Sequence, residues 1–135
     1  MIKYIIGFFI GLCLLFILIK NNVYNDKTII LGASIPKTGI MKEWGRSVEI
    51  GTNAYFKYVN EKNLLPENRN IRLITLDDKY EPELTYENTQ KFLDQKDLFS
   101  LFAYVGTPTI RIILPLLEKS KIPFVSPFSG ASFLR

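Results

Sequence analysis

A regular alternation of short apolar runs and helix-type segments restricts the fold of this chain more than any other feature. In chain order, strands and helices are predicted by turns over residues 29–34, 43–60, 71–76, 83–94, 98–105, from Thr107 onward, and over 124–126. This β-α-β-α-β-α-β order at short spacing predicts an α/β fold with an open parallel sheet, right-handed crossovers and helices on both faces. The runs are mostly apolar, which is typical of strands buried on both faces.

Proline and threonine mark where two of these helices begin. Pro82 suits the first turn of the second helix, and the third opens with Thr107 as N-cap and Pro108 at the first helical position. Pro115 falls inside the third helix and is expected to kink it. In the first helix, the spacing predicts a shared apolar face made by Val48, Ala54, Tyr55, Tyr58 and Val59.

An uncharged apolar run over residues 4–19, with a lysine at each end, precedes this pattern. Its 16 residues exceed a signal-peptide core of about 7–15 residues and fall just short of a membrane span of about 20 residues. No A-x-A-like cleavage site follows the run. Residues 1–20 are therefore predicted to form an uncleaved membrane anchor, with a cleaved signal peptide or a lipid anchor as the alternatives.

The anchor divides the chain into three parts. Residues 1–20 form the anchor or signal helix, residues 21–27 a polar linker, and residues 28–135 the folded domain. Each alternative for the first part sends the domain outside the cytoplasm, to the periplasmic face of the inner membrane or into secretion.

The residue types that the chain lacks exclude several kinds of chemistry. There is no histidine, and the single cysteine, Cys13, lies inside the apolar run, so disulfides within the chain, cysteine-rich zinc sites and histidine-based catalysis are excluded. Residues 21–135 carry 15 basic and 13 acidic side chains, a balance that argues against a nucleic-acid partner. No phosphate-binding glycine motif is present, and no nucleophile has a visible base. The sequence therefore predicts neither an enzyme nor a bound cofactor or metal.

Ligands of open parallel sheets bind beyond the carboxyl ends of the strands, where the winding changes direction. Four predicted loops lie at that end of the sheet, over residues 34–45, 77–80, 104–109 and 126–132. In the third loop, Gly106 permits close approach of the backbone. Thr107 offers a hydroxyl and free N–H groups at a helix N-terminus, which suits a carboxylate. The alternative interpretation of Thr107 is a plain helix cap.

Other residues of these loops have two interpretations each. Trp44 is either a ligand-facing ring or a half-buried packing residue. The small hydroxyl residues and glycine of 126–132 suit contact with a polar ligand, or form an ordinary turn. Asp77 and Asp78 are predicted to form turns and caps, with a metal or acid–base pair as the alternative. Lys37 is predicted to be a solvated loop lysine, with a role as an anion partner as the alternative.

These motifs, in this order and at this spacing, resemble a known family. They are Ser34 to Gly39, Trp44-Gly45, Gly51 and Asn60 in the first helix, Leu76 to Asp78, Gly106 to Thr109, Ile122-Pro123 and Ser126 to Ala131. Over residues 29–135 the chain resembles the N-terminal lobe of type I periplasmic solute-binding proteins, the leucine/isoleucine/valine-binding group. It departs from them in having Asn63-Leu64-Leu65-Pro66 where the family often has a Gly-Gly turn.

The resemblance implies two α/β lobes that are joined by a hinge and close on a small ligand. It implies that Thr107 and neighbouring N–H groups hold the ligand's carboxylate and that Trp44 packs against the ligand. The ligand-binding residues that it implies are Thr38, Trp44, Gly106, Thr107, Thr109, Ser129, Gly130 and Ala131. The lobe is expected to be incomplete and the chain truncated, without the second lobe, so the lone lobe is expected to bind weakly.

The implied function is extracytoplasmic binding of a small, amino-acid-like solute, as the substrate-binding component of an ABC transporter with an ABC permease as partner. The alternative is a ligand-sensing extracytoplasmic domain of a membrane signalling protein, with an output domain as partner. An uncleaved N-terminal helix would attach the chain to the membrane and favours the sensor, whereas a cleaved or lipidated N-terminus favours the transporter.

Overall fold

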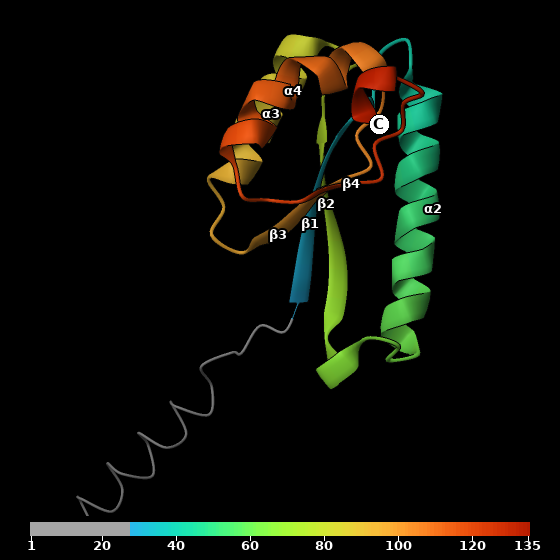
Figure 1. Cartoon of the computed structure of the whole chain (residues 1–135). Coiled ribbons are helices and arrows are strands. Elements are labelled where there is room, and N and C mark those ends of the chain that lie inside the picture. Colours follow the sequence, from blue (N-terminus) through green and yellow to red (C-terminus); the bar gives the residue numbers. More distant parts are fainter. Residues whose placement is uncertain (1–27) are drawn as a thin grey trace, which may run out of the picture.

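The computed structural model describes residues 28–135, which form a four-stranded sheet with helices on both of its faces (Figure 1). The elements are β1 (Thr28–Ile35), α2 (Lys42–Glu61), β2 (Asn70–Asp77), α3 (Pro82–Leu93), β3 (Leu98–Phe102), α4 (Thr107–Lys119) and β4 (Phe124–Val125). Short 3-10 turns lie at Pro66–Asn68 and Ser132–Leu134. The predicted anchor, signal and linker lie outside the described residues. Among the helices of residues 28–135, none combines the length and the apolar character needed to cross a membrane.

All strands run parallel in the order β2-β1-β3-β4, so the predicted parallel α/β sheet is confirmed. β1 and β2 pair along their whole length, from Thr28 opposite Asn70 to Ile35 opposite Asp77. The chain moves to one side of β1 to form β2, and then crosses to the other side to form β3 and β4. The direction of winding therefore changes between β1 and β3.

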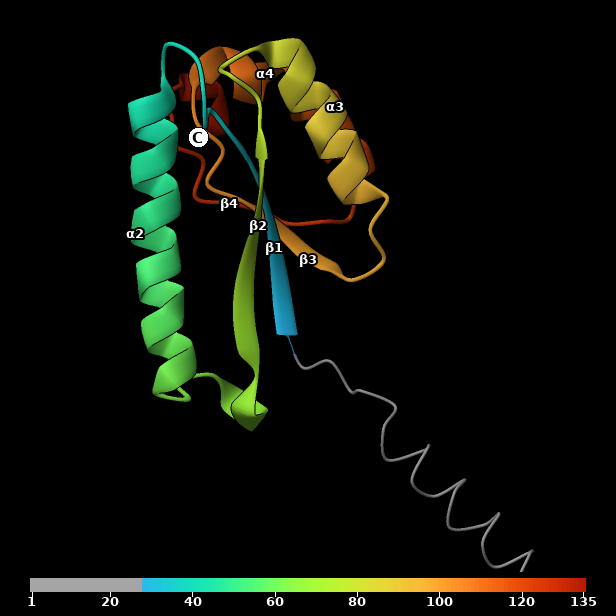
Figure 2. The ribbon, with the colours of Figure 1, turned by 180° about the vertical axis from the view of Figure 1, so that it is seen from behind.

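The helices change face where the winding changes direction. α2 lies on one face of the sheet, and α3 and α4 lie together on the other, as opposite views show (Figure 1, Figure 2). This arrangement is the one expected when all crossovers share one hand. Each face has its own core. Ile30, Phe92, Leu98, Leu101, Tyr104, Ile110 and Ile113 are buried on the α3 and α4 side, and Ala33, Ile35 and Val105 on the α2 side.

The predicted apolar face of α2 is partly wrong. Tyr55 is 63% exposed and Tyr58 is 50% exposed, and Ala54 is also exposed. The face that α2 turns to the sheet is instead made by Gly45, Val48, Thr52, Phe56 and Val59. These residues also follow helical spacing, so the sequence pattern of this helix fits more than one face. Contact of Phe56 with Phe102 on β3, at 5.8 Å between ring centroids, decides between them.

β3 and β4 are shorter than predicted, because the backbone turns sharply after each of them. β3 ends at Phe102 rather than Val105, since Ala103 has a φ of 52°. β4 ends at Val125 rather than Ser126, whose φ is 54°. The apolar runs continue through these turns, so apolar character alone predicts longer strands. Pro115 does not end the third predicted helix, because α4 continues through it to Lys119.

The C-terminal end of α2 is fastened to the edge strand β2. The Asn60 side chain accepts a hydrogen bond from the Ile71 N–H and donates one to the Ile71 carbonyl, both at 2.9 Å. Asn63, in the turn where the family often has glycine, has a φ of 49°. The N–H groups of Asn63 and Leu64 donate to the carbonyls of Asn60 and Val59, which is the Schellman pattern of a helix end.

Candidate ligand-binding site

A pocket of about 440 Å³ lies beyond the carboxyl ends of the strands, where the winding of the sheet changes direction. All four loops predicted to lie there contribute to it, so the location agrees with the general rule for open parallel sheets. Its lining residues are Met41, Trp44, Tyr80, Val105, Gly106, Thr107, Pro127, Phe128, Ser129 and Gly130. None of these side chains carries a charge, so any ligand held here is held by neutral groups.

One wall of the pocket is the first turn of α4. Gly106 occupies the N-cap position with a φ of 105°, and Thr107 is the first helical residue rather than the predicted N-cap. No side chain caps this turn, so the first N–H groups of α4 are left for another acceptor. The Thr107 hydroxyl is instead hydrogen-bonded to the Ser129 hydroxyl at 2.8 Å. Two hydroxyl groups therefore meet beside the N-terminus of a helix.

The loop after β4 is held against this turn by backbone hydrogen bonds. The Gly106 N–H donates to the Phe128 carbonyl at 3.1 Å, and the Phe128 N–H donates to the Tyr104 carbonyl at 2.8 Å. Val105 and Phe128 form an isolated parallel bridge, which extends the pairing of β3 and β4 into the loops. The main chain thereby brings Ser129 within reach of Thr107.

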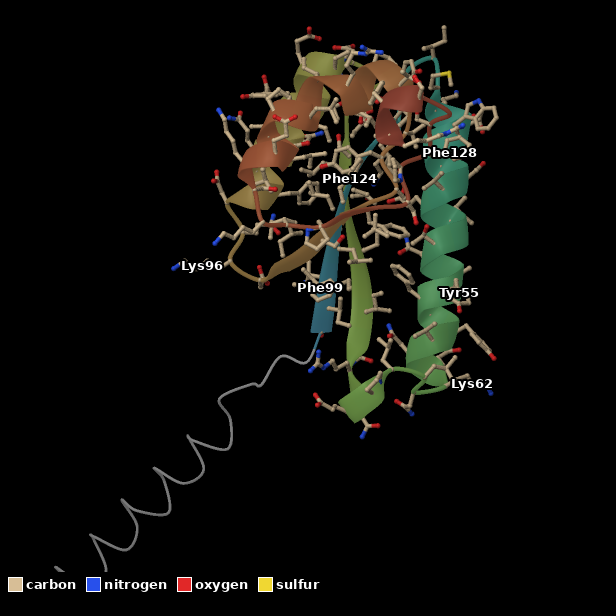
Figure 3. The ribbon with its side chains drawn as sticks, viewed as in Figure 1. Tyr55, Lys62, Lys96, Phe99, Phe124 and Phe128 are labelled. Carbon is tan, nitrogen blue, oxygen red and sulfur yellow. The ribbon has the colours of Figure 1, made fainter. Side chains whose placement is uncertain are left out.

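Aromatic rings form the opposite wall. Trp44, at the start of α2, is 52% exposed, and its ring centroid lies 5.5 Å from that of Phe128. Figure 3 shows Phe128 beside this end of α2. Gly45 allows the start of α2 to pack against Pro36 of the first loop, because a Cβ there would stand 2.0 Å from the Pro36 carbonyl oxygen. Trp44 is thus a packing residue that also forms part of the pocket wall, and its contact with a ligand stays a prediction.

The loop after β2 adds Tyr80 to the pocket. Asp77 accepts hydrogen bonds from the Lys37, Thr38 and Lys79 N–H groups and from the Thr38 hydroxyl, and so joins the first loop to the second. Asp78 is fully buried and accepts from the Ser34 and Thr85 hydroxyls and from the Tyr80 N–H. The predicted turn-forming role of the two aspartates is confirmed, but their predicted capping role is wrong, because Glu81 is the N-cap of α3 and no side chain caps that helix.

The two aspartates have opposite pKa shifts. Burial pushes the pKa of Asp77 upward, but the hydrogen bonds from Thr38, Lys79 and Lys37 outweigh it, and the pKa lies below its ordinary value. Burial dominates for Asp78 and raises its pKa in spite of the three groups that donate to it. Among residues 28–135, no cluster of three or more acidic, cysteine or histidine side chains could hold a metal ion.

Lys37 is neither a freely solvated side chain nor a pocket residue. Its ammonium group contacts the Glu49 carboxylate and the Thr75 hydroxyl, both at 2.9 Å. The anion that it pairs with is therefore part of the chain itself. Burial pushes the pKa of Glu49 upward, but the hydrogen bonds from Thr75 and Lys37 together with the charge of Lys37 outweigh it and lower the pKa.

The structure brings together five of the eight predicted ligand-binding residues. Trp44, Gly106, Thr107, Ser129 and Gly130 all line the pocket.

The other three do not line the pocket, and each makes hydrogen bonds within the chain instead. The Thr38 hydroxyl donates to Asp77 at 2.6 Å, the fully buried Thr109 hydroxyl donates to the carbonyls of Val105 and Gly106, and the Ala131 N–H donates to Ser129.

Sequence reasoning assigned no role to Met41, Tyr80, Val105, Pro127 or Phe128. The rule that placed the four loops at one edge of the sheet covers all five of these residues, since Met41 lies in the first loop. It could have found them as loop residues, but not which of them face the pocket.

The matches to known proteins cover this whole region. A family model described as periplasmic binding protein matches residues 28–133. A solved structure described as a possible leucine/isoleucine/valine-binding protein from Rhodopirellula baltica is 34% identical over 82% of the chain, with a TM-score of 0.77. A substrate-binding periplasmic protein from Ralstonia solanacearum is 27% identical over 77% of the chain, with a TM-score of 0.72.

A more distant structure shares the fold. It is the branched-chain amino acid transporter substrate-binding protein of Streptococcus pneumoniae in complex with isoleucine, which is 17% identical over 79% of the chain, with a TM-score of 0.71. The chain spans about 30% of the length of each of these three solved proteins. No curated protein matches the sequence.

Proposed function

The chain belongs to the periplasmic binding protein family, of which it is a partial N-terminal lobe, and from this premise we propose that its pocket binds a small carboxylic acid of amino-acid type. The observation that carries the proposal is the pairing of Thr107 and Ser129 hydroxyls at the uncapped N-terminus of α4, inside a pocket lined by all four loops. The transporter role, as the substrate-binding component that delivers solute to an ABC permease, is part of the same proposal.

A carboxylate suits this end of the pocket for electrostatic reasons. The N-terminus of a helix carries a partial positive charge and unpaired N–H groups, both of which favour an anion. Hydroxyl groups rotate, so Thr107 and Ser129 can each donate to a ligand oxygen in place of their mutual hydrogen bond. A carboxylate can thereby be bound without a cation, which agrees with the uncharged lining.

The rest of the pocket suits an apolar body. The same pocket that contains the α4 turn has an apolar surface, made by Met41, Trp44, Val105 and Phe128. Burial of a branched or aromatic side chain against them would add the non-directional part of the affinity. Because members of this family are periplasmic, we also propose an extracytoplasmic location, with membrane attachment through residues 1–20 as a further prediction.

The first experiment is a titration of the full 135-residue chain with L-isoleucine, followed by ¹H–¹⁵N correlation spectra. Isoleucine is the ligand of the streptococcal relative and therefore a reasonable probe. The amide signals of Thr107, Ser129 and Gly130 are expected to shift at millimolar isoleucine. The proposal fails if neither isoleucine nor a panel of other L-amino acids moves any of these signals.

A variant pair tests the hydroxyl contact. Thr107→Val keeps the shape of the side chain but removes the hydroxyl, and is expected to weaken binding about three- to tenfold, the effect of one lost hydrogen bond. Thr52→Val, on the sheet-facing side of α2 and outside the pocket, is the matched control and should leave the affinity unchanged. An equal effect of both substitutions would contradict the assigned role of Thr107.

A further inference from the structure

Two consecutive residues of the loop after β2 adopt a backbone conformation that side chains disfavour. Lys79 has a φ of 53° and Tyr80 a φ of 70°. Such residues persist only where surrounding contacts determine the backbone, and they concentrate at ligand sites. Here the Lys79 N–H donates to Asp77 at 3.0 Å and the Tyr80 N–H donates to Asp78 at 2.9 Å.

These contacts are themselves firmly held. Asp78 is fully buried between the Ser34 and Thr85 hydroxyls, and Asn88 donates to Ser34 at 3.1 Å. The conformation of the loop is therefore fixed by buried hydrogen bonds, and its backbone sets the orientation of the Tyr80 ring.

That direction is the pocket wall beside α4. The Tyr80 ring packs on Gly106, where a Cβ would stand 2.3 Å from a ring carbon and 2.9 Å from the hydroxyl oxygen. The Tyr80 hydroxyl thus lies next to the residue that precedes Thr107, within the pocket lining. Inside residues 28–135, this hydroxyl has no hydrogen-bond partner in the chain and is accessible to solvent, since no buried polar side-chain atom there lacks a partner. The hydroxyls of Thr107 and Ser129 are by contrast paired with each other.

We propose that Tyr80 is a specificity-determining residue, whose hydroxyl hydrogen-bonds a polar group on the carbon next to the ligand's carboxylate. This inference rests on the proposed function, since it takes the carboxylate to lie at Thr107. The Tyr80 ring packs on Gly106, the residue directly before Thr107. A ligand group that contacts the Tyr80 hydroxyl while the carboxylate is bound at Thr107 must therefore be close to that carboxylate. The ligand class selected is α-amino or α-hydroxy acids, in preference to acids that lack the α substituent.

The test compares two ligands that differ only at this position, L-isoleucine and 3-methylpentanoate. The full chain is titrated with each, and the Thr107 and Ser129 amide signals are followed. The wild-type chain is expected to prefer isoleucine several-fold. Tyr80→Phe keeps the ring on Gly106 but removes the hydroxyl, and is expected to weaken isoleucine binding about fivefold or more while leaving 3-methylpentanoate unchanged.

Tyr55→Phe is the matched control, because Tyr55 is 63% exposed on α2 and does not line the pocket (Figure 3). Three results would overturn the inference while the proposed function stands: an unchanged isoleucine affinity in Tyr80→Phe, an equal loss for both ligands, or an equal loss in Tyr55→Phe. If neither ligand moves the pocket signals of the wild-type chain, the proposed function fails, and the inference fails with it.

Discussion

At the scale of single residues, Gly106 combines three requirements that no other residue type meets. Its φ of 105° lies in the region that favours glycine, it is the N-cap of α4, and its missing side chain leaves room for the Tyr80 ring. Its N–H also holds the loop after β4 through the Phe128 carbonyl. The geometry of the pocket therefore depends on the absence of a side chain at this position.

Gly106→Ala is expected to lower the free energy of unfolding by about 2–4 kcal/mol, since the backbone strain adds to a steric overlap with Tyr80. Urea denaturation followed by circular dichroism measures the change. Gly51→Ala is the matched control, because Gly51 lies inside α2 with open space around it, and this substitution should be neutral or slightly stabilising. A loss of less than about 0.5 kcal/mol for Gly106→Ala would contradict the argument.

Asp77 makes the joint between the first two loops sensitive to pH. Its folded pKa is below the ordinary value of 3.8, so it stabilises the fold above that pH, and this contribution is lost as the pH falls towards the lowered pKa. Asp77→Asn is expected to cost about 1 kcal/mol near pH 7 and clearly less near pH 3. Urea midpoints at the two pH values measure the difference, and an equal cost at both would show that the charge is irrelevant.

At the scale of elements, the bounds of the first two strands and the first two helices are predicted to within one residue. Proline and aspartate mark the turns around β1, β2 and α3, whereas the bounds of α2 follow from its helical spacing alone. The ends of β3 and β4 were not predictable from apolar character, because Ala103 and Ser126 turn the backbone through positive φ values that composition does not reveal. The sheet-facing side of α2 was ambiguous for a similar reason, since aromatic residues lie on both of its sides.

Asn60 forms one of the polar contacts between α2 and β2. Asn60→Ala removes both hydrogen bonds to Ile71 and is expected to lower the free energy of unfolding by about 1–2 kcal/mol, because the two backbone groups are partly buried. The exposed Asn53 on the same helix offers the control Asn53→Ala, for which a change within about 0.5 kcal/mol is expected. Chemical denaturation of both variants decides the point, and similar losses would contradict it.

At the scale of the whole molecule, the order of the elements predicts where the pocket lies. It does not predict which side chains line the pocket. The order of strands and helices placed four loops at one edge of the sheet, and five of the eight predicted ligand-binding residues line the pocket there. Tyr80 was not predicted, because its direction depends on two strained residues and on a buried aspartate. Thr109 and Thr38 have suitable side chains, but their hydroxyls are engaged by the chain itself.

The pocket of the described lobe is open to solvent on one side, and this limits its affinity for a ligand. A ligand on an open surface keeps part of its hydration, and little of its area is buried. The full chain is therefore expected to bind L-isoleucine with a millimolar dissociation constant. Isothermal titration calorimetry measures this value, and micromolar binding would show that a single lobe encloses the ligand.

Trp44 has a practical consequence, because it is the chain's single tryptophan and it lies in the pocket wall against Phe128. Its intrinsic fluorescence comes from one known place, so a change in emission on adding a solute reports the pocket without any label. The same fluorophore would follow the loosening of the first and fourth loops during denaturation, while circular dichroism follows the helices. A difference between the two curves would reveal that the binding loops come apart before the sheet does.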